Sequence, residues 1–238
     1  MPSSTISLTL RGRELSLYVG EDAFIPTTTT QRIAEAIDLP PNADVLDLGC
    51  GVGPLAIWCA LEGAARVHAV DVVEAAAQYA RENAELNGVA DKVQVHHGDL
   101  FEPVHDKKFD IIVNDVSGIA DRVARLSSWY PDPIPTGGND GTDVVTRMLS
   151  ESPDHLKPGG SIYFATATLS NVTKIIDHAR KIYGDRLEKV SSSRFPFSAE
   201  LNEHREELEQ LREQGLIEFE TRRSRMLWTL DVWHAKVD

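Results

Sequence analysis

Residues 45–54 read Val-Leu-Asp-Leu-Gly-Cys-Gly-Val-Gly-Pro, an apolar run followed by glycines at every second position from Gly49 to Gly53. Glycine lets the backbone turn sharply and approach a ligand closely, and proline favours the first turn of a helix. The segment therefore predicts a buried strand, a glycine turn beside a ligand, and a helix. The dinucleotide fingerprint requires glycine at position 54, where this chain has Pro54, so a nicotinamide site is excluded. A turn without a ligand would leave Asp47 unexplained, because a carboxylate at a strand end needs donors.

Strand-like and helix-like patterns alternate after residue 43. Apolar runs predict strands, and helical periodicity predicts helices between them. The strands are expected at 44–48, 66–71, 92–97, 109–114 and 161–166, and the helices at 54–62, 74–86, 142–155 and 171–183. This alternation predicts a doubly wound α/β fold with a mostly parallel sheet and helices on both faces. Strands at 186–193 and 226–236 are expected to pair antiparallel at the sheet edge, which gives a seven-stranded sheet with an antiparallel edge strand.

The first forty residues have a different pattern. Alternating apolar residues on both sides of Gly12 predict a β-hairpin, and a helix is expected at 31–39 after the threonines Thr27 to Thr30, one of which would cap it. We therefore divide the chain into an N-terminal hairpin and helix at 1–40 and a main domain at 41–238. Segments 117–139 and 197–223 are predicted insertions on the substrate side of the main domain.

Acidic residues recur where the next two strands end. Asp71 ends the strand at 66–71, and Asp99 follows the strand at 92–97. The carboxyl ends of parallel strands meet at one edge of the sheet, where doubly wound folds bind their ligands. A carboxylate in the position of Asp71 can accept both hydroxyls of a ribose, although it can also cap the following helix. The three acids Asp47, Asp71 and Asp99 are therefore expected to converge on one crevice.

The glycine motif resembles the first motif of the class I S-adenosylmethionine-dependent methyltransferases, a family with a Rossmann-like fold. The pattern E/D-x-G-x-G-x-G stands here as Asp47, Gly49, Gly51 and Gly53, and the resemblance covers roughly residues 20–185. It implies that Asp47 lies near the methionine amino group and that the glycines face the cofactor. It further implies that S-adenosyl-L-methionine is the cofactor and S-adenosyl-L-homocysteine the product. The other implied cofactor-binding residues are Asp71 with Val72 at the ribose, Asp99 with Leu100 at the adenine, and Asn114.

The segment that follows the fourth strand departs from the family pattern. Methyltransferases that act on amide or aromatic amino nitrogens often carry Asn-Pro-Pro-Tyr there, whereas residues 114–117 read Asn-Asp-Val-Ser. Asn114 can still accept a hydrogen bond from the acceptor, and Asp115 can accept the proton that the acceptor loses. We predict both as catalytic residues, with a solvent-facing or capping carboxylate as the alternative for Asp115. Other segments are similar to release-factor glutamine methyltransferases, their "small methyltransferase" relatives and ribosomal-protein methyltransferases.

Two segments are candidates for choosing the acceptor. The long segment at 117–139 contains Trp129 and Tyr130, which either cover the acceptor or pack the loop onto the body. The helix expected at 200–214 has a narrow apolar stripe and many acids, which indicates either a solvated surface helix or a lid or dimer contact. A homodimer is therefore an open prediction.

Composition limits the partners and the compartment. The chain has 238 residues with 24 Lys+Arg against 37 Asp+Glu, a formal net charge of −13, which disfavours nucleic acid as a partner. Its two cysteines, Cys50 and Cys59, are too few for a disulfide framework or a four-thiolate zinc site, and no metal is expected. No stretch is long enough for a membrane span, and the start lacks the pattern of a secretory signal. We predict a cytoplasmic enzyme.

The leading hypothesis is methyl transfer to a nitrogen or oxygen of a small molecule. The alternatives are N-methylation of a protein side chain of the glutamine or lysine type, a non-catalytic cofactor-binding module, and aminopropyl transfer with the decarboxylated cofactor. The lost Asn-Pro-Pro-Tyr motif counts against glutamine as the acceptor.

Overall fold

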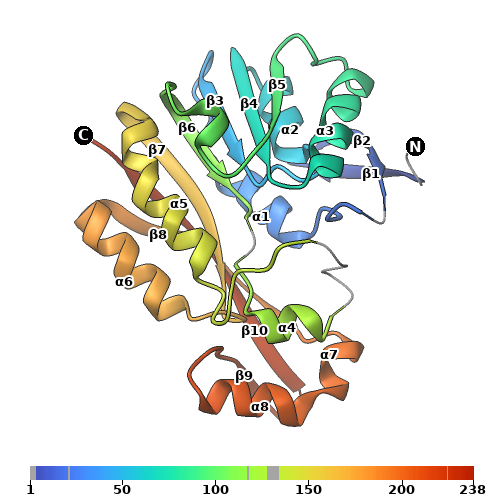
Figure 1. Cartoon of the computed structure of the whole chain (residues 1–238), viewed down its shortest axis with the longest axis vertical. Helices are drawn as coiled ribbons and strands as arrows, with labels where there is room; N and C mark the ends of the chain where they lie inside the picture. The colour runs from blue at the N-terminus through green and yellow to red at the C-terminus, as the bar shows by residue number, and fades with distance from the viewer. Residues whose placement is uncertain (1–3, 21, 117, 128–133, 224) are drawn as a thin grey trace.

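The computed structural model describes residues 4–20, 22–116, 118–127, 134–223 and 225–238 (Figure 1). The strands are β1 (Ser4–Leu10), β2 (Arg13–Val19), β3 (Asp44–Leu48), β4 (Arg66–Asp71), β5 (Val93–His97), β6 (Phe109–Asn114), β7 (Leu156–Ala167), β8 (Leu187–Pro196), β9 (Glu220–Arg222) and β10 (Arg225–Lys236). The α-helices are α1 (Thr28–Ala36), α2 (Pro54–Leu61), α3 (Glu74–Leu86), α4 (Asp121–Arg125), α5 (Asp143–Glu151), α6 (Val172–Tyr183), α7 (Ala199–Glu203) and α8 (Arg205–Glu213). Short 3₁₀ turns lie at Glu102–Val104, Ser152–His155 and Gly184–Arg186.

The central sheet has the strand order β5-β4-β3-β6-β7-β10-β8, with β9 paired to β10. Strands β3 to β7 pair in parallel, and β10 runs antiparallel to both β7 and β8. The predicted doubly wound, mostly parallel α/β fold is confirmed, with eight strands instead of the predicted seven because the short strand β9 adds to β10. The antiparallel strand β10 lies one position in from the edge, because β8 covers its outer side.

Helices cover both faces of the sheet, as expected for parallel strands whose side chains are buried on both sides. In Figure 1, α5 and α6 lie on one face and α2 and α3 on the other. A hydrophobic core lies on each face of the sheet, and successive side chains of β3 point into opposite cores. Val45 packs in the core that contains α2 and α3, whereas Leu46 and Leu48 pack with α5 and α6.

The predicted hairpin is confirmed and packs on the same core as α2 and α3. Asn83 of α3 is fully buried and fastens it. Its side-chain oxygen accepts from the Tyr18 backbone N–H at 2.6 Å, and its side-chain nitrogen donates to the Tyr18 carbonyl at 3.0 Å and the Val52 carbonyl at 2.9 Å. Thr27 caps α1 by accepting from the Thr29 backbone N–H at 3.2 Å. The helix begins at Thr28, three residues before the predicted start.

The segment at 197–223 forms a small layer with α4 below the sheet in Figure 1. The single helix expected at 200–214 is two helices, α7 and α8, which meet at His204. Its apolar stripe of Leu201, Leu208 and Leu211 is fully buried against α4 and the end of β10, so the helix does more than present a solvated face.

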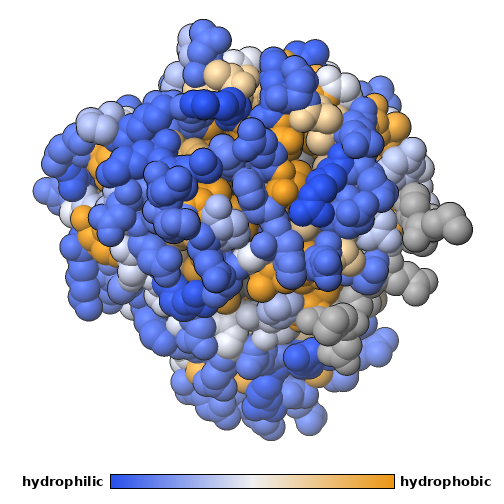
Figure 2. Space-filling view, turned by 45° about the horizontal axis from the view of Figure 1, so that its top comes forward, coloured by the Kyte–Doolittle hydropathy of each residue, from blue (hydrophilic) through white to orange (hydrophobic). Residues whose placement is uncertain are grey.

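The outer surface seen in Figure 2 is mainly hydrophilic, with hydrophobic residues visible in patches between the hydrophilic ones.

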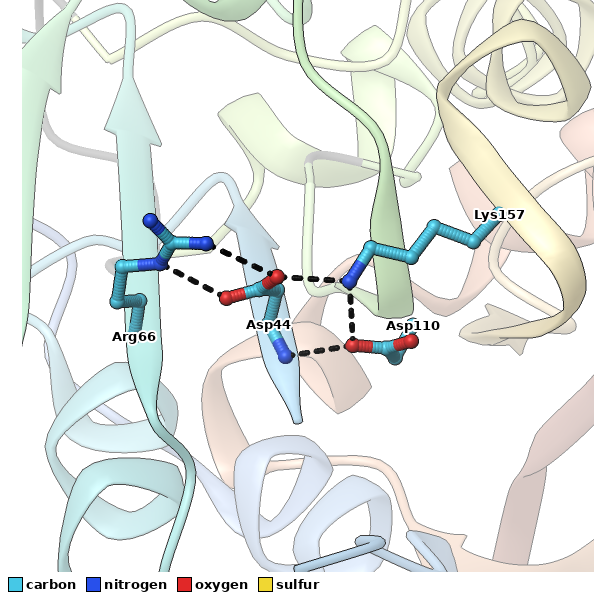
Figure 3. A network of polar contacts seen from close by, with 4 residues as sticks. All are labelled: Asp44, Arg66, Asp110 and Lys157. Atoms are coloured by element: carbon cyan, nitrogen blue, oxygen red, sulfur yellow. Dashed lines mark hydrogen bonds and ion pairs between the residues drawn. The ribbon is translucent and has the colours of Figure 1, made fainter. Parts of the chain in front are cut away.

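Charge is arranged differently at the two edges of the sheet. At the amino ends of the strands, Asp44 contacts Arg66 and Lys157, and Lys157 also contacts Asp110 (Figure 3). This network joins β3, β4, β6 and β7, and it lowers the pKa of Asp44 to about 2, first through the hydrogen bonds from Arg66.

Candidate active site

A cavity of about 760 Å³ opens at the opposite edge, at the carboxyl ends of the strands. Besides this edge, its lining includes residues just before α4 and α7, such as Ile119 and Ser198. Its walls come from the start of α1, the glycine turn after β3, the ends of β4, β5 and β6, and residues of β7, β8 and β10. The volume is in the range of ligand pockets, and the position is where doubly wound sheets bind ligands.

The glycine turn needs its glycines for two different reasons. Gly49, Gly51 and Gly53 have φ values of +68°, +53° and +89°, which favour glycine. A Cβ on Gly49 would also lie 2.8 Å from Cγ1 of Val116, and one on Gly53 would lie 3.1 Å from Cβ of Ala80 on α3. Gly49 and Gly51 line the cavity, whereas Gly53 lies outside its lining and allows α2 and α3 to pack closely.

Asp47 lines the cavity from the end of β3 and is fully buried. Its Oδ2 accepts from the Ala56 backbone N–H at 2.9 Å, whereas its Oδ1 is buried without a hydrogen-bond partner among the described residues. Burial, together with the nearby carboxylate of Asp115, raises the pKa of Asp47 to about 8. An unpartnered carboxylate oxygen at a cavity wall suits a cationic ligand.

Asp71 ends β4 beside the glycine turn. Its Oδ2 accepts from the Gly51 backbone N–H at 2.7 Å and its Oδ1 from the Val73 backbone N–H at 2.8 Å, so it supports both the turn and the start of α3. Burial raises its pKa. Both oxygens keep a further lone pair, and Asp71 lines the cavity with Val72, which is 50% exposed. The capping and ligand interpretations of Asp71 are therefore compatible.

Asp99 and Leu100 line the cavity after β5. Asp99 is paired with Arg147 of α5, whose Nη2 donates to Oδ2 at 2.6 Å. Leu100 is buried and has a φ of +45°, a conformation that is uncommon outside glycine. Sequence reasoning missed Arg147, because nothing in the pattern of α5 singles out this position.

The two predicted catalytic residues have different surroundings. Asn114 is the last residue of β6, is buried, and lies outside the lining of the cavity, and its amide nitrogen has no partner among the described residues. Asp115 lines the cavity, and one of its oxygens accepts from the Thr30 hydroxyl at 2.9 Å. Burial raises the pKa of Asp115 to about 6. Of the two, Asp115 is the residue placed to meet a ligand.

An aromatic pair forms the wall at the far end of the sheet. Phe195 of β8 and Trp228 of β10 are cross-strand partners, their ring centroids are 5.0 Å apart, and both line the cavity. The predicted acceptor residues Trp129 and Tyr130 lie outside the described residues. The alternation in β10 predicts a common face for Trp228 and Leu230, but only the tertiary structure places that face at the cavity.

Two further features concern the described part of the chain. No group of three or more histidine, cysteine, aspartate or glutamate side chains is arranged to hold a metal ion there. None of its helices has the length and apolar character needed to cross a membrane.

Comparison with known proteins decides the family. The family model "Methyltransferase small domain" matches residues 27–115. The "Putative protein N5-glutamine methyltransferase MJ0928" of Methanocaldococcus jannaschii is 31% identical over 156 residues, which cover 66% of this chain and 77% of that protein. The chain belongs to the class I S-adenosylmethionine-dependent methyltransferases.

Other relatives support this assignment and differ in their named acceptors. The release factor glutamine methyltransferase of Synechocystis is 34% identical over 166 residues, which cover 62% of this chain and 55% of that protein. This methyltransferase therefore spans about half the length of that relative. The solved structure of a T. thermophilus 16S rRNA N2 G1207 methyltransferase, in complex with AdoMet and guanosine, matches with a TM-score of 0.65 and 19% identity, covers 99% of this chain and 50% of that one, and shows a shared fold.

The residues of the cavity fit S-adenosylmethionine, the cofactor of this methyltransferase. The cofactor supplies an electrophilic methyl group on a positively charged sulfonium. The unpartnered Oδ1 of Asp47 would accept from its amino group, and the remaining lone pairs of Asp71 would accept from its ribose hydroxyls. Thr27, Thr28 and Thr29 at the start of α1 also line the cavity and would offer hydroxyl donors to its carboxylate, whereas the Thr30 hydroxyl already donates to Asp115.

Proposed function

We propose that this methyltransferase transfers the methyl group to a nitrogen atom of a protein side chain. The observation that carries the proposal is the position of Asp115, a carboxylate that lines the cavity and has a pKa of about 6. An N–H acceptor must lose a proton when the nitrogen is methylated, and a base with a pKa near neutrality suits this transfer. The relatives named for glutamine residues of release factors and ribosomal protein uL3 support a protein acceptor over a small molecule.

The neighbours of Asp115 support its role as the proton acceptor. The Thr30 hydroxyl donates to one carboxylate oxygen, which fixes the side chain and leaves the other oxygen for the acceptor. The buried Asn114 lies directly before it, so we assign Asn114 to positioning the end of β6 rather than to contact with the acceptor.

The test is methyl transfer from isotopically labelled S-adenosylmethionine to purified release factor, ribosomal proteins and a panel of metabolites, with the modified atom located by mass spectrometry. We expect label on a side-chain nitrogen of a protein. Asp115→Asn should lower turnover at least 100-fold while it retains binding of S-adenosylhomocysteine. Asp177→Asn on the exposed side of α6 is the matched control and should be unchanged. Label found only on metabolites, or on oxygen, would overturn the proposal.

A further inference from the structure

The cavity carries more negative charge than the cofactor neutralises. Four aspartates line it, namely Asp47, Asp71, Asp99 and Asp115. Arg147 is the single lysine or arginine among the described lining residues, and it is already paired with Asp99. Buried or partly buried carboxylates that lack a cation are costly, so this arrangement favours cationic ligands.

The methionine end of the cofactor accounts for part of this charge. Its amino group and sulfonium are positive and its carboxylate is negative, a net charge of about +1 at neutral pH. Asp47 is fully buried with one unpartnered oxygen and suits the amino group, and Asp71 is held by two backbone N–H groups. Among the described residues, the Asp115 carboxylate has only the neutral Thr30 hydroxyl as a hydrogen-bond partner, so its charge is left for the acceptor.

The sheet register places the aromatic pair on the same rim as Asp115. Asn114 pairs with Phe164, so Asp115 follows β6 at the level of Ala165 in β7. Ala167 pairs with Leu230 in β10, and Trp228, two residues before Leu230, pairs with Phe195 in β8. The cavity lining includes Asp115, Ala165, Ala167, Leu230, Trp228 and Phe195. The carboxylate of Asp115 follows β6, and the two aromatic rings lie on β10 and β8, on the other side of β7.

We propose that the acceptor is a cationic nitrogen group, an amine or a guanidine such as the end of a lysine or arginine side chain, held between Asp115 and the Phe195–Trp228 pair. This inference rests on the proposed function, because it names the class of nitrogen that the site methylates. Aromatic faces attract cations, most strongly where water is excluded, and a carboxylate completes the site. A neutral carboxamide can donate a hydrogen bond to the carboxylate, but it lacks the positive charge that strengthens both interactions. Asp115 also replaces the first proline of the Asn-Pro-Pro-Tyr pattern, which holds planar amide nitrogens in the resembling enzymes.

The proton balance agrees with this acceptor. The cationic amine or guanidine gives up one proton before attack, and the nitrogen lone pair then forms the new bond to the methyl carbon. The carbon–sulfur bond breaks with its electron pair remaining on sulfur, which leaves a neutral thioether. Asp115 accepts the released proton and later passes it to water. The pKa of about 6 lets Asp115 be mostly ionised at pH 7, so that it attracts the cation first.

The binding test uses the full chain saturated with S-adenosylhomocysteine and two pairs of probes of similar shape. The pairs are n-butylamine with butyramide and methylguanidine with methylurea, and dissociation constants are measured by calorimetry or NMR titration at pH 7. We expect each cation to bind at least tenfold more tightly than its neutral counterpart. Equal binding of the two members of both pairs would overturn the inference.

Variants separate the two ends of the proposed site. Asp115→Asn should abolish the preference for cations, and Trp228→Leu should weaken cation binding at least threefold more than neutral binding, with recovery in Trp228→Phe. Asp177→Asn is the matched control and should keep the preference. If Asp115→Asn fails to fold, the Trp228 series still tests the inference, since an unchanged preference in Trp228→Leu contradicts it.

A transfer assay distinguishes failure of this inference from failure of the proposed function. Peptides with a single glutamine, lysine or arginine are incubated with labelled cofactor. Methylation of lysine or arginine supports both proposals. Methylation of glutamine alone overturns the inference and keeps the proposed function. Methylation of cationic metabolites but of no peptide or protein overturns the proposed function and keeps the cationic acceptor.

Discussion

Replacing Asp47 with asparagine should stabilise the ligand-free protein and weaken its cofactor binding. Asp47 is fully buried, and its pKa is raised from 3.8 to about 8. For a carboxyl group whose pKa is higher in the folded state, stability is unaffected below pH 3.8, falls as the pH rises, and levels off above about pH 8. Between pH 3.8 and pH 7, which is roughly three pH units, the free energy of unfolding falls by about 1.4 kcal/mol per unit, or about 4 kcal/mol in all.

Asparagine has a similar shape and cannot ionise, so Asp47→Asn should remove most of this cost. We expect a gain of about 2–4 kcal/mol at pH 7, which corresponds to a rise in Tm of at least about 4 °C for a chain of this size. At pH 4 the wild type has hardly begun to ionise Asp47, and the gain should fall below about 1 kcal/mol. Differential scanning calorimetry at pH 4 and pH 7 measures both values. A variant that is less stable at pH 7, or equally stabilised at both pH values, would refute this assignment of the cost to the Asp47 charge.

Cofactor binding should change in the opposite direction. If the ammonium of the cofactor selects ionised Asp47, wild-type affinity rises about 20-fold from pH 6 to pH 7.5, less a factor of about 1.5 because an α-amino group has begun to lose its proton at pH 7.5. Ionisation of Asp115, whose pKa is about 6, raises the cofactor affinity only about twofold over this pH range. Asp47→Asn should bind S-adenosylmethionine about 10- to 100-fold more weakly at pH 7.5 and retain only the twofold pH effect. Titration calorimetry in two buffers also counts the released proton, and a full 20-fold pH effect in the variant would contradict the role of Asp47.

Three further substitutions test the fold around the site. Gly49→Ala should lower the free energy of unfolding by about 1–3 kcal/mol and weaken cofactor binding at least tenfold, because its Cβ would lie 2.8 Å from Val116 at a φ of +68°. Unchanged thermal denaturation and unchanged cofactor binding in calorimetry would contradict this. Asn83→Ala should lower the free energy of unfolding measured by urea denaturation by about 2–4 kcal/mol and expose the hairpin amides to hydrogen exchange. Full protection of these amides in the variant would disprove the role of Asn83 in holding the hairpin. Asp44→Asn should lower the free energy of unfolding by about 1–2 kcal/mol at pH 7. The lowered pKa of Asp44 adds stability above pH 3.8, and this stability is lost as the pH falls through about 2. An equal destabilisation by the variant at pH 2 would argue against the ion pairs of Asp44.

Most of the fold follows from local sequence patterns. The strands β3, β4 and β6 and the helix α3 have the predicted bounds, because each combines a periodic apolar pattern with a clear stop signal. The start of β7 was misplaced, since Lys157-Pro158-Gly159-Gly160 has the composition of a turn, yet Leu156 pairs with Phe109 and the strand begins there. The short helix α4 was not predicted, because its burial depends on contacts with α8 that no local pattern reveals.

The candidate site could be predicted only in part, because local patterns do not reveal contacts between elements that are distant in sequence. Acids at strand ends are recognisable because the topology brings those ends together, and the four aspartates do line one cavity. Asn114 is the exception, since it lies in β6 and its side chain is buried outside the lining. Arg147, Phe195 and Trp228 reach the cavity from elements distant in sequence, so tertiary packing alone assigns them. The possible homodimer and the low expectation of nucleic acid as a partner stay predictions.

The two ends of the same strands use carboxylates in opposite ways. Asp44 starts β3 and Asp110 lies near the start of β6, and both are paired with Lys157. At the carboxyl ends of these strands, Asp47 and Asp115 have no cationic partner among the described residues, and burial raises the pKa of each. The pairs at the first edge stabilise the folded state, whereas the isolated charges at the second edge reduce its stability. Because a cationic ligand relieves that cost, the cavity should favour ligands that bring positive charge.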